Sequence, residues 1–226
     1  MEKIKDEIYG VAQKILKRWS RAGIEPFIKE SISNGSSGMN LILVVGGRGP
    51  VLDFIKKQYG SHPIVTLDIN PDFKPDIVAD LSEQNLASKI QKIFDLVLIV
   101  EVLEHIPKYE EALDNIYQLL KPGGLLVGTT PWSTPLHDKP FDFFRYTSYQ
   151  IEKMLKTAQF KDIKIESRGN LYDSIIYLGL RGLKTWGIKG KLLFLIFAPI
   201  SLFSKRPKRS LILHDSCIGY NFTGRK

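Results

Sequence analysis

Three carboxylates in the chain each follow a short apolar segment. Asp68 ends Ile-Val-Thr-Leu-Asp, Asp80 ends Asp-Ile-Val-Ala-Asp, and Glu101 directly follows Phe-Asp-Leu-Val-Leu-Ile-Val. Apolar segments of this length are typical of buried strands, so each acid is expected where a strand ends. A carboxylate in that place can accept hydrogen bonds from the hydroxyl or amino groups of a bound ligand.

Two histidines have the chemistry of a general base. His105 follows Glu101 closely, and His137 lies in a polar and aromatic loop behind the next apolar segment. Imidazole accepts a proton near neutral pH and can thereby help a hydroxyl group to react. His137 and His105 are therefore candidate catalytic bases, with helix capping or packing as the alternative role of His105.

The loop of His137 also contains polar side chains that could meet a substrate: Asp142, Arg145 and Tyr146. The Asp and the Arg are expected to pair and to hold the loop's shape. Three phenylalanines are expected to anchor the loop to the core: Phe141, Phe143 and Phe144. Glu101 and Glu104 could bind a cationic acceptor, but no close cluster has the spacing of a metal site, so no metal is expected.

A glycine cluster follows the first apolar segment, residues 41–45. It reads Gly46-Gly47-Arg48-Gly49 and leads directly into a helix-like segment. Glycines let the backbone approach a ligand closely, and a helix N-terminus offers free N–H groups, so a nucleotide-like ligand is expected here. Asp68, at the end of the next strand, can accept hydrogen bonds from both hydroxyls of a ribose.

The elements that position these residues alternate along the chain. Strands are expected at 41–45, 64–68, 76–80, 94–100, 125–130, 163–165 and 217–223. Helices are expected after residue 50 and at 82–90, 109–120 and 147–158. This alternation predicts an α/β fold: a Rossmann-like, seven-stranded, mostly parallel sheet with helices on both faces and the last strand antiparallel.

Two cofactors are usual on such a sheet, a dinucleotide and S-adenosylmethionine. The dinucleotide pattern G-x-G-x-x-G, started at Gly47, ends on Leu52 instead of glycine, which weakens that reading. Asp80 could instead accept a hydrogen bond from an adenine amino group, with Leu81 bordering the ring.

Three motifs then follow in order. Residues 102–106 read Val-Leu-Glu-His-Ile, residues 120–124 read Leu-Lys-Pro-Gly-Gly, and residues 137–147 fit H-x(4)-D-F-x-R-Y-T. With the preceding strand ends, the set resembles the class I S-adenosylmethionine-dependent methyltransferases over about residues 41–167. The resemblance implies S-adenosyl-L-methionine as the cofactor, bound by Gly46, Gly47, Gly49, Asp68, Ile69, Asp80, Leu81 and Glu101.

Composition indicates a folded protein with an uneven charge. The chain is 43% hydrophobic and 25% charged, and its single cysteine, Cys217, excludes an internal disulfide, which suits a cytoplasmic, reducing setting. The net charge is +8, but residues 181–226 hold ten lysines and arginines against one acid. Such a basic segment is expected to meet an anionic partner or to form a solvated face.

The predicted domain organisation has three parts. An amphipathic capping helix and linker occupy 1–38, the core occupies 39–170 and 210–226, and an insertion occupies 171–209. The insertion contains an apolar run, 192–203, with basic residues on both sides. It is too short to span a bilayer, which takes about 20 residues. The region 186–209 could lie in an anionic membrane surface at the inner face, form a lid, or make a homodimer contact.

The leading functional hypothesis is O-methylation of a small-molecule, glycan or lipid-linked acceptor by in-line displacement. A nucleic-acid methyltransferase is disfavoured, because the fourth strand end lacks an Asn/Asp-Pro-Pro-Tyr/Phe motif. A non-catalytic cofactor-binding or membrane-adaptor protein is the third hypothesis. It is motivated by Val44, which stands where related proteins usually carry an acid, and by the irregular glycine spacing.

Overall fold

The computed structural model describes residues 20–21, 23–35, 40–46, 49–186, 189, 190, 193, 196 and 216–226. The chain divides into two compact units. The larger contains Glu25–Trp132, Leu136–Glu166 and Tyr220–Lys226, and the smaller contains Met1–Ile24, Ser133–Pro135 and Ser167–Gly219. The predicted helix at 4–19, the basic run 205–209 and most of the apolar run 192–203 lie outside the described residues.

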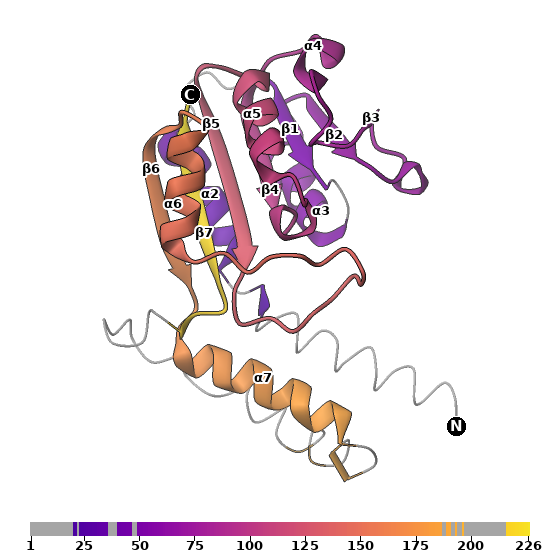
Figure 1. Ribbon diagram of the computed structural model, residues 1–226, viewed down its shortest axis with the longest axis vertical. Coiled ribbons are helices and arrows are strands. Elements are labelled where there is room, and N and C mark those ends of the chain that lie inside the picture. The colour runs from indigo at the N-terminus through magenta and orange to yellow at the C-terminus, as the bar shows by residue number, and fades with distance from the viewer. Residues whose placement is uncertain are drawn as a thin grey trace. The chain divides into compact units, whose positions relative to one another are not determined.

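Seven strands form one sheet in the order β3-β2-β1-β4-β5-β7-β6 (Figure 1). Strands β1 to β5 pair in parallel wherever they are neighbours. Their bounds are β1 Ile42–Val45, β2 Ile64–Asp68, β3 Ile77–Val78, β4 Phe94–Val100, β5 Leu120–Pro131, β6 Lys161–Arg168 and β7 Gly219–Arg225.

The last strand runs against its neighbours. Gly123 N, near the start of β5, donates to Lys226 O at 3.0 Å, and Ser133 N, just beyond the end of β5, donates to Ile218 O at 3.1 Å. Ile218 N, at the start of β7, in turn donates to the carbonyl of Arg168, the last residue of β6, at 3.0 Å. The predicted fold, with a mostly parallel sheet and an antiparallel last strand, is therefore confirmed.

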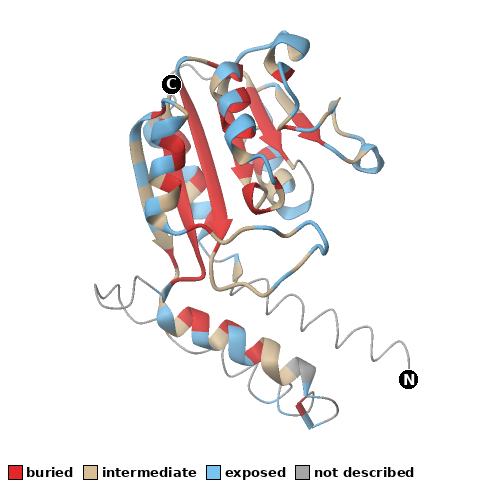
Figure 2. Ribbon diagram, viewed as in Figure 1, coloured by how far each residue is buried: buried red, intermediate tan, exposed pale blue. Residues whose placement is uncertain are grey.

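Helices cover both faces of the sheet, so its central strands are mostly apolar. In Figure 1, α5 (Tyr109–Leu119) and α6 (Ser148–Thr157) lie in front of the sheet, with α2 (Ile24–Gly35) and α3 (Gly49–Tyr59) behind it. A short helix, α4 (Leu86–Ile90), precedes β4. Every residue of β1 is buried, and Figure 2 shows most of β5 as buried strand, which corresponds to residues 124–131.

Helix α2 was not predicted. Its apolar side chains, Ile24, Ile28 and Ile32, recur every four residues and are almost completely buried. This spacing places them on one helical face, so a periodicity search over this segment would have found the helix.

The Lys-Pro-Gly-Gly segment is also different from the prediction. The strand was predicted at 125–130, with this segment between it and the preceding helix, but residues 121–124 belong to β5. Pairing shifts from Phe94↔Leu120 to Leu96↔Leu125, so the extra residues form a bulge in the strand. Gly123 has a φ of +76°, a conformation that favours glycine and lets the bulge form.

The end of the β5 to α6 connection follows the sequence closely. Thr147 caps α6, and its side chain accepts a hydrogen bond from Gln150 N at 3.1 Å. A side-chain cap of this kind satisfies an N–H group that the helix itself leaves without a partner. The helix predicted at 147–158 is therefore confirmed, with Thr147 as its N-cap residue.

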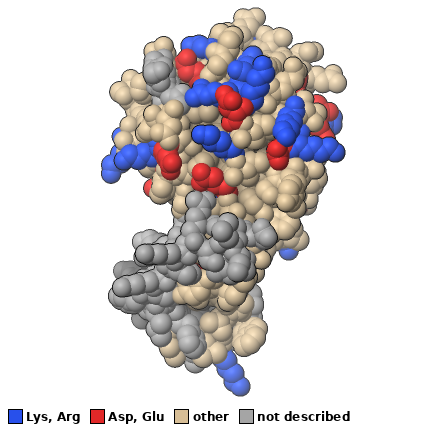
Figure 3. Space-filling model, turned by 90° about the vertical axis from the view of Figure 1, so that its left-hand side faces the viewer, with Lys and Arg blue, Asp and Glu red and all other residues tan. Residues whose placement is uncertain are grey.

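Charges of both signs are interspersed on the face of the larger unit in Figure 3. This matches the sequence, in which the excess of positive charge lies in residues 181–226. The predicted insertion begins with α7 (Leu171–Thr185), which is capped by reciprocal hydrogen bonds between Asn170 and Asp173. Among the described residues, the longest apolar helical stretch is still too short to cross a membrane.

Candidate active site

The carboxyl ends of the parallel strands bring the predicted ligand residues to one edge of the larger unit. Val45 of β1 pairs with Leu67 of β2 and with Ile99 of β4. The residues that follow these strands therefore lie on adjacent strand ends: Gly46, Asp68 and Glu101. In open α/β sheets this edge is where ligands bind.

Gly46 is required by its surroundings. Its N–H donates to Leu67 O at 2.8 Å, and its φ is +67°. A Cβ at this position would lie 2.5 Å from Val102 Cγ2, so a larger residue would force the strand ends apart. Gly49 starts α3 with a φ of +66° and has open space where its Cβ would be. Gly47, the third predicted glycine, lies outside the described residues.

Asp68 is buried at the end of β2. Its Oδ1 accepts a hydrogen bond from Asn70 N at 2.9 Å, which fixes the carboxylate. Within the described part of the chain, Oδ2 accepts no hydrogen bond and is available to a ligand hydroxyl. Ile69, the next residue, exposes its apolar side chain at the same edge.

Asp80 and Leu81 follow β3. Asp80 Oδ1 accepts from Ser82 N at 2.8 Å and from Ser82 Oγ at 2.7 Å. Leu81 is buried, and its carbonyl accepts from Asn115 Nδ2 at 2.9 Å. Asn115 was missed by sequence reasoning. A buried amide among the apolar residues of α5 was its signal, because a buried amide needs a hydrogen-bond partner.

Glu101 holds an unusual backbone conformation. Its φ is +54°, in the left-handed region that non-glycine residues rarely adopt. Its Oε1 accepts from Thr129 Oγ1 at 2.9 Å, and its N–H donates to Thr129 O at 3.0 Å. Strain of this type persists where surrounding contacts enforce it, and it is common at functional sites.

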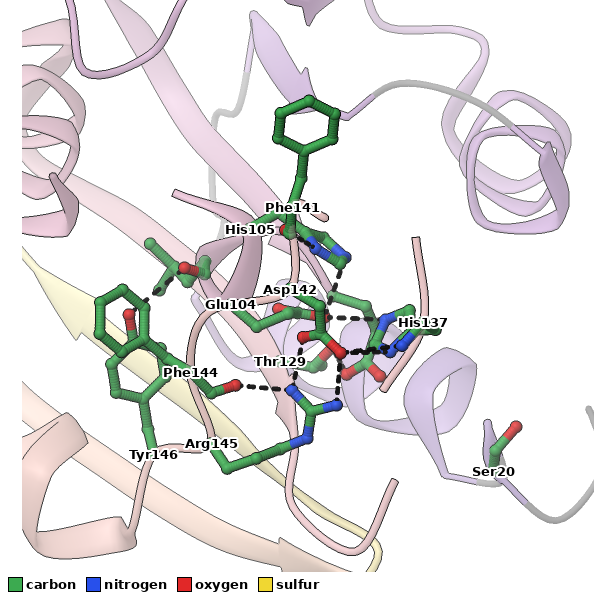
Figure 4. A network of polar contacts seen from close by, with 12 residues as sticks. Ser20, Glu104, His105, Thr129, His137, Phe141, Asp142, Phe144, Arg145 and Tyr146 are labelled. Carbon is green, nitrogen blue, oxygen red and sulfur yellow. Dashed lines mark hydrogen bonds and ion pairs between the residues drawn. The ribbon is translucent and has the colours of Figure 1, made fainter. Parts of the chain in front are cut away.

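The two candidate bases meet at Glu104. His105 Nε2 lies 3.7 Å from Glu104 Oε1, and His137 Nε2 lies 3.9 Å from the same oxygen. The Glu104 side chain is 0% exposed, and the imidazole rings contact each other edge to face with centroids 4.9 Å apart. Figure 4 shows the three side chains converging, with Glu104 and His105 from the 3₁₀ turn η2 (Leu103–His105) and His137 from the loop beyond β5.

Each imidazole is oriented by an acceptor at its other nitrogen. His105 Nδ1 lies 2.7 Å from Phe141 O, and His137 Nδ1 lies 3.2 Å from Asp142 Oδ2. A carbonyl can only accept, and an ionised carboxylate likewise, so each Nδ1 carries the hydrogen in the neutral ring. The lone pair of each neutral ring is therefore on Nε2, the nitrogen closer to Glu104.

Asp142 is held by two parallel hydrogen bonds from Arg145. The distances are 2.6 Å from Nη1 to Oδ1 and 2.7 Å from Nη2 to Oδ2, so the predicted pair is confirmed. The Arg145 guanidinium, with further help from the backbone N–H of His137, holds the pKa of the Asp142 carboxyl well below its usual range. Asp142 is therefore a fixed negative charge behind His137.

Tyr146 is buried, and its hydroxyl donates to Leu103 O at 3.3 Å. Burial raises the pKa of the Tyr146 phenol well above its ordinary value, so the group stays neutral. Its ring stacks on Phe144, with centroids 5.2 Å apart. In the structure Tyr146 thus packs the loop against η2.

The predicted anchoring by phenylalanines is wrong for two of the three. Phe141 is 63% exposed and Phe143 is 45% exposed, whereas Phe144 is partly buried against Tyr146. The loop is held by its backbone instead, because Phe143 N and Phe144 N donate to Glu104 O at 2.9 and 3.2 Å. With those bonds made, two of the rings are free to face solvent.

Comparison with known proteins agrees with this architecture. A methyltransferase domain family matches residues 17–164. A curated relative, the ubiquinone/menaquinone biosynthesis C-methyltransferase UbiE of Psychromonas ingrahamii, is 25% identical over 128 residues. The match covers 50% of this chain and 51% of the relative, so the chain spans about half the length of that protein.

Solved structures share the fold. A S-adenosylmethionine-dependent methyltransferase from Archaeoglobus fulgidus superposes with a TM-score of 0.55 at 18% identity, covering 93% of this chain and 97% of that one. One from Clostridium acetobutylicum gives a TM-score of 0.56 at 12% identity, covering 96% and 98%. A Haemonchus contortus phosphoethanolamine N-methyltransferase gives 0.51 at 17% identity, covering 96% and 52%.

The family match extends over more than half of the chain. The chain therefore belongs to the methyltransferase domain family, within the class I S-adenosylmethionine-dependent methyltransferases.

Proposed function

We propose that this protein transfers a methyl group from S-adenosyl-L-methionine to an oxygen of a small-molecule, glycan or lipid-linked acceptor. The proposal rests mainly on one observation: two oriented imidazoles converge on the buried Glu104 carboxylate. They lie in the same unit as the strand ends that carry Gly46, Asp68, Asp80 and Glu101, which we call the cofactor edge. This arrangement suits an acceptor whose proton must leave as the new bond forms.

The cofactor edge offers backbone and side-chain groups that suit S-adenosylmethionine. The backbone can approach closely at Gly46 and Gly49, the Asp68 carboxylate suits a ribose hydroxyl, and Asp80 suits an adenine amino group. Glu101, fixed by Thr129, suits the cationic amino group of the methionine part. When bound, this cofactor supplies an electrophilic methyl group on a sulfonium sulfur.

His137 is the proposed proton acceptor. Its Nδ1–H is held by the charged Asp142, so Nε2 keeps its lone pair and can take a proton from an acceptor hydroxyl. The positive charge that then develops on the ring is stabilised by Asp142 on one side and by Glu104 on the other. General-base assistance of this kind contributes about 10²- to 10⁴-fold to a rate.

The loop that carries His137 is evidence that the acceptor has an apolar part. Leu136, Phe141 and Phe143 are exposed in that loop, at 62%, 63% and 45%. Several large apolar side chains exposed together often mark a binding site. The curated relative is named for ubiquinone and menaquinone biosynthesis, and quinone precursors join an aromatic ring to an apolar chain. These observations favour a lipid-linked or aromatic acceptor over a plain sugar.

Membrane contact through residues 186–209 remains a prediction from the sequence. Liposomes of neutral or anionic lipid would be mixed with the full chain and with a variant carrying glutamine at the four basic positions Lys205, Arg206, Lys208 and Arg209. Co-sedimentation of the unaltered chain with anionic liposomes only, and its loss in the variant, is expected. Equal recovery of both chains in every supernatant would remove the membrane contact.

The catalytic proposal is tested by methyl transfer from labelled S-adenosylmethionine to a panel of hydroxylated quinone precursors, phenols and polyprenyl-linked sugars. Label is expected in an ether product with at least one apolar acceptor, and in none when His137 is replaced by glutamine. Label only on carbon would overturn the assignment to oxygen. Cofactor binding without transfer to any acceptor would favour an adaptor that does not catalyse.

A further inference from the structure

The loop of residues 136–146, which we call the acceptor loop, forms with η2 a cluster of side chains of the types that bind metal ions. Glu104, His105 and His137 each offer one ligand atom, and these atoms all lie within 4.8 Å of one another. Across the part of the chain that the structure describes, they are the one such group of three. Spacing along the sequence did not reveal it, because His137 reaches the other two from a distant loop.

The orientation of the imidazoles is the second observation. Metal-bound histidines usually donate their other ring N–H to a carbonyl or a carboxylate, which fixes the tautomer and aims the free nitrogen at the metal. His105 and His137 make one contact of each type, to Phe141 O at 2.7 Å and to Asp142 Oδ2 at 3.2 Å. Asp142 is itself fixed by Arg145, so the outer layer of such a site is already in place.

The distances also suit a small ion. With bonds of roughly 2.0–2.1 Å, two ligand atoms of a tetrahedral zinc ion lie about 3.4 Å apart. Here Glu104 Oε1 is 3.7 Å from one Nε2 and 3.9 Å from the other, and the three ligand atoms all lie within 4.8 Å of one another, so the side chains have to move inward to reach zinc-binding distances. The two imidazoles are 21% and 29% exposed, which leaves a way in for the ion.

We propose that Glu104, His105 and His137 bind a divalent transition-metal cation of the zinc class, with a fourth position open to solvent or to an acceptor oxygen. Three protein ligands with one open position is the arrangement of catalytic rather than structural zinc sites. Two imidazoles favour zinc, cobalt or nickel over magnesium, which prefers oxygen ligands.

The use of this ion in catalysis rests on the proposed function, whereas its binding does not. A cation lowers the pKa of a bound hydroxyl and so performs the task of a base. With a metal bound, His137 would be a ligand rather than a base, and a hydroxyl bound at the open position would release its proton to solvent as its oxygen attacks the methyl group.

The test uses the untagged full chain, stripped with a chelator and titrated with zinc chloride in a calorimeter. Cobalt chloride serves as the optical probe, because its visible absorption reports tetrahedral coordination. One equivalent of zinc is expected to bind, with affinity reduced by about tenfold or more in Glu104→Gln, His105→Gln and His137→Gln. His62→Gln, which removes a histidine outside the cluster, is the control and is expected to bind as the unaltered chain does.

Glu104 is buried, so its variant is compared only if its thermal melting is unaltered, and the two histidine variants otherwise decide. No stoichiometric binding, or equal affinity in His105→Gln, His137→Gln and His62→Gln, would overturn the site. S-adenosylhomocysteine is titrated in parallel. Zinc binding without cofactor binding would sink the proposed function alone, and cofactor binding without zinc binding would sink the metal site alone.

Discussion

The cofactor edge and the acceptor loop are built in different ways. At the cofactor edge each carboxylate has its own separate partner: Asn70 for Asp68, Ser82 for Asp80 and Thr129 for Glu101. The acceptor loop and η2 instead hold each other: Phe141 O of the loop holds His105 of η2, and within the loop Asp142 holds His137. The edge is therefore a set of separate parts, whereas the loop is a connected network.

This difference has a consequence for how each region responds to change. Groups that share partners show coupling energies, whereas distant groups with separate partners have additive effects. A substitution at one residue of the cofactor edge should therefore affect only that residue's own contacts. A substitution in the acceptor loop should also affect the contacts of its neighbours in the network.

The largest expected effect is on rate. Replacing His137 with glutamine should lower kcat by about 10²- to 10⁴-fold, because it removes the proton acceptor or the metal ligand. Affinity for S-adenosylhomocysteine should change less than about twofold, since the edge is held independently. Steady-state kinetics and calorimetry measure the two quantities. A parallel loss of cofactor affinity would show that the two regions are not separate.

The next effect is on stability. Arg145→Ala leaves the Asp142 carboxylate, which is 1% exposed, without its guanidinium partner. Breaking a buried ion pair in this way costs about 3–5 kcal/mol in the free energy of unfolding, here at the lower end because Arg145 is partly exposed. Urea denaturation measures the change, with Lys156→Ala, which breaks an exposed pair, as the control. A loss as small as that of the control would mean that the pair does not hold the loop.

A third effect concerns the glycine turn. Gly46→Ala adds a Cβ that collides with Val102 and also strains a positive φ, whereas Gly49→Ala brings only the strain. The strain costs about 1–2 kcal/mol in the free energy of unfolding at either position. A larger loss of stability in Gly46→Ala than in Gly49→Ala therefore measures the collision. Affinity for S-adenosylhomocysteine should fall further in Gly46→Ala than in Gly49→Ala. Equal losses would remove the argument for close packing at Gly46.

Coupling between pairs of positions is the prediction most specific to the comparison. Free energies of unfolding would be measured for two pairs of substitutions, each as single variants and as the double variant. The edge pair is Asp68→Asn and Asp80→Asn, and the loop pair is His137→Gln and Asp142→Asn. The edge pair should be additive within about 0.5 kcal/mol, whereas the loop pair should deviate by more, up to about 3 kcal/mol. Similar coupling in both pairs would contradict the distinction between separate parts and a connected network.

The same distinction explains what could be predicted from the sequence. Strands β2 and β4 were predicted with the bounds they have, because apolar runs ending on an acid are local signals. The strand-end residues of the cofactor edge follow from those strands. By contrast, the approach of His137 to Glu104 depends on how a long loop folds back, and no local pattern encodes it.

Other differences have local physical causes. The exposure of Phe141 and Phe143 could not be read from their apolar character, because backbone hydrogen bonds to Glu104 O hold the loop in their place. The bulge at Lys121–Gly124 depends on pairing with β7, from the other end of the chain. Helix α2 was missed although its isoleucine spacing was visible, so that omission was avoidable.

Calorimetric titration of the full chain with S-adenosylhomocysteine tests the central claim most directly. The unaltered chain should bind one equivalent, and His137→Gln should bind with the same affinity. Asp68→Ala should bind about tenfold or more weakly, because it loses a hydrogen bond to a charged acceptor. Absence of binding by the unaltered chain, or equal affinity in Asp68→Ala, would contradict the assignment of this edge to the cofactor.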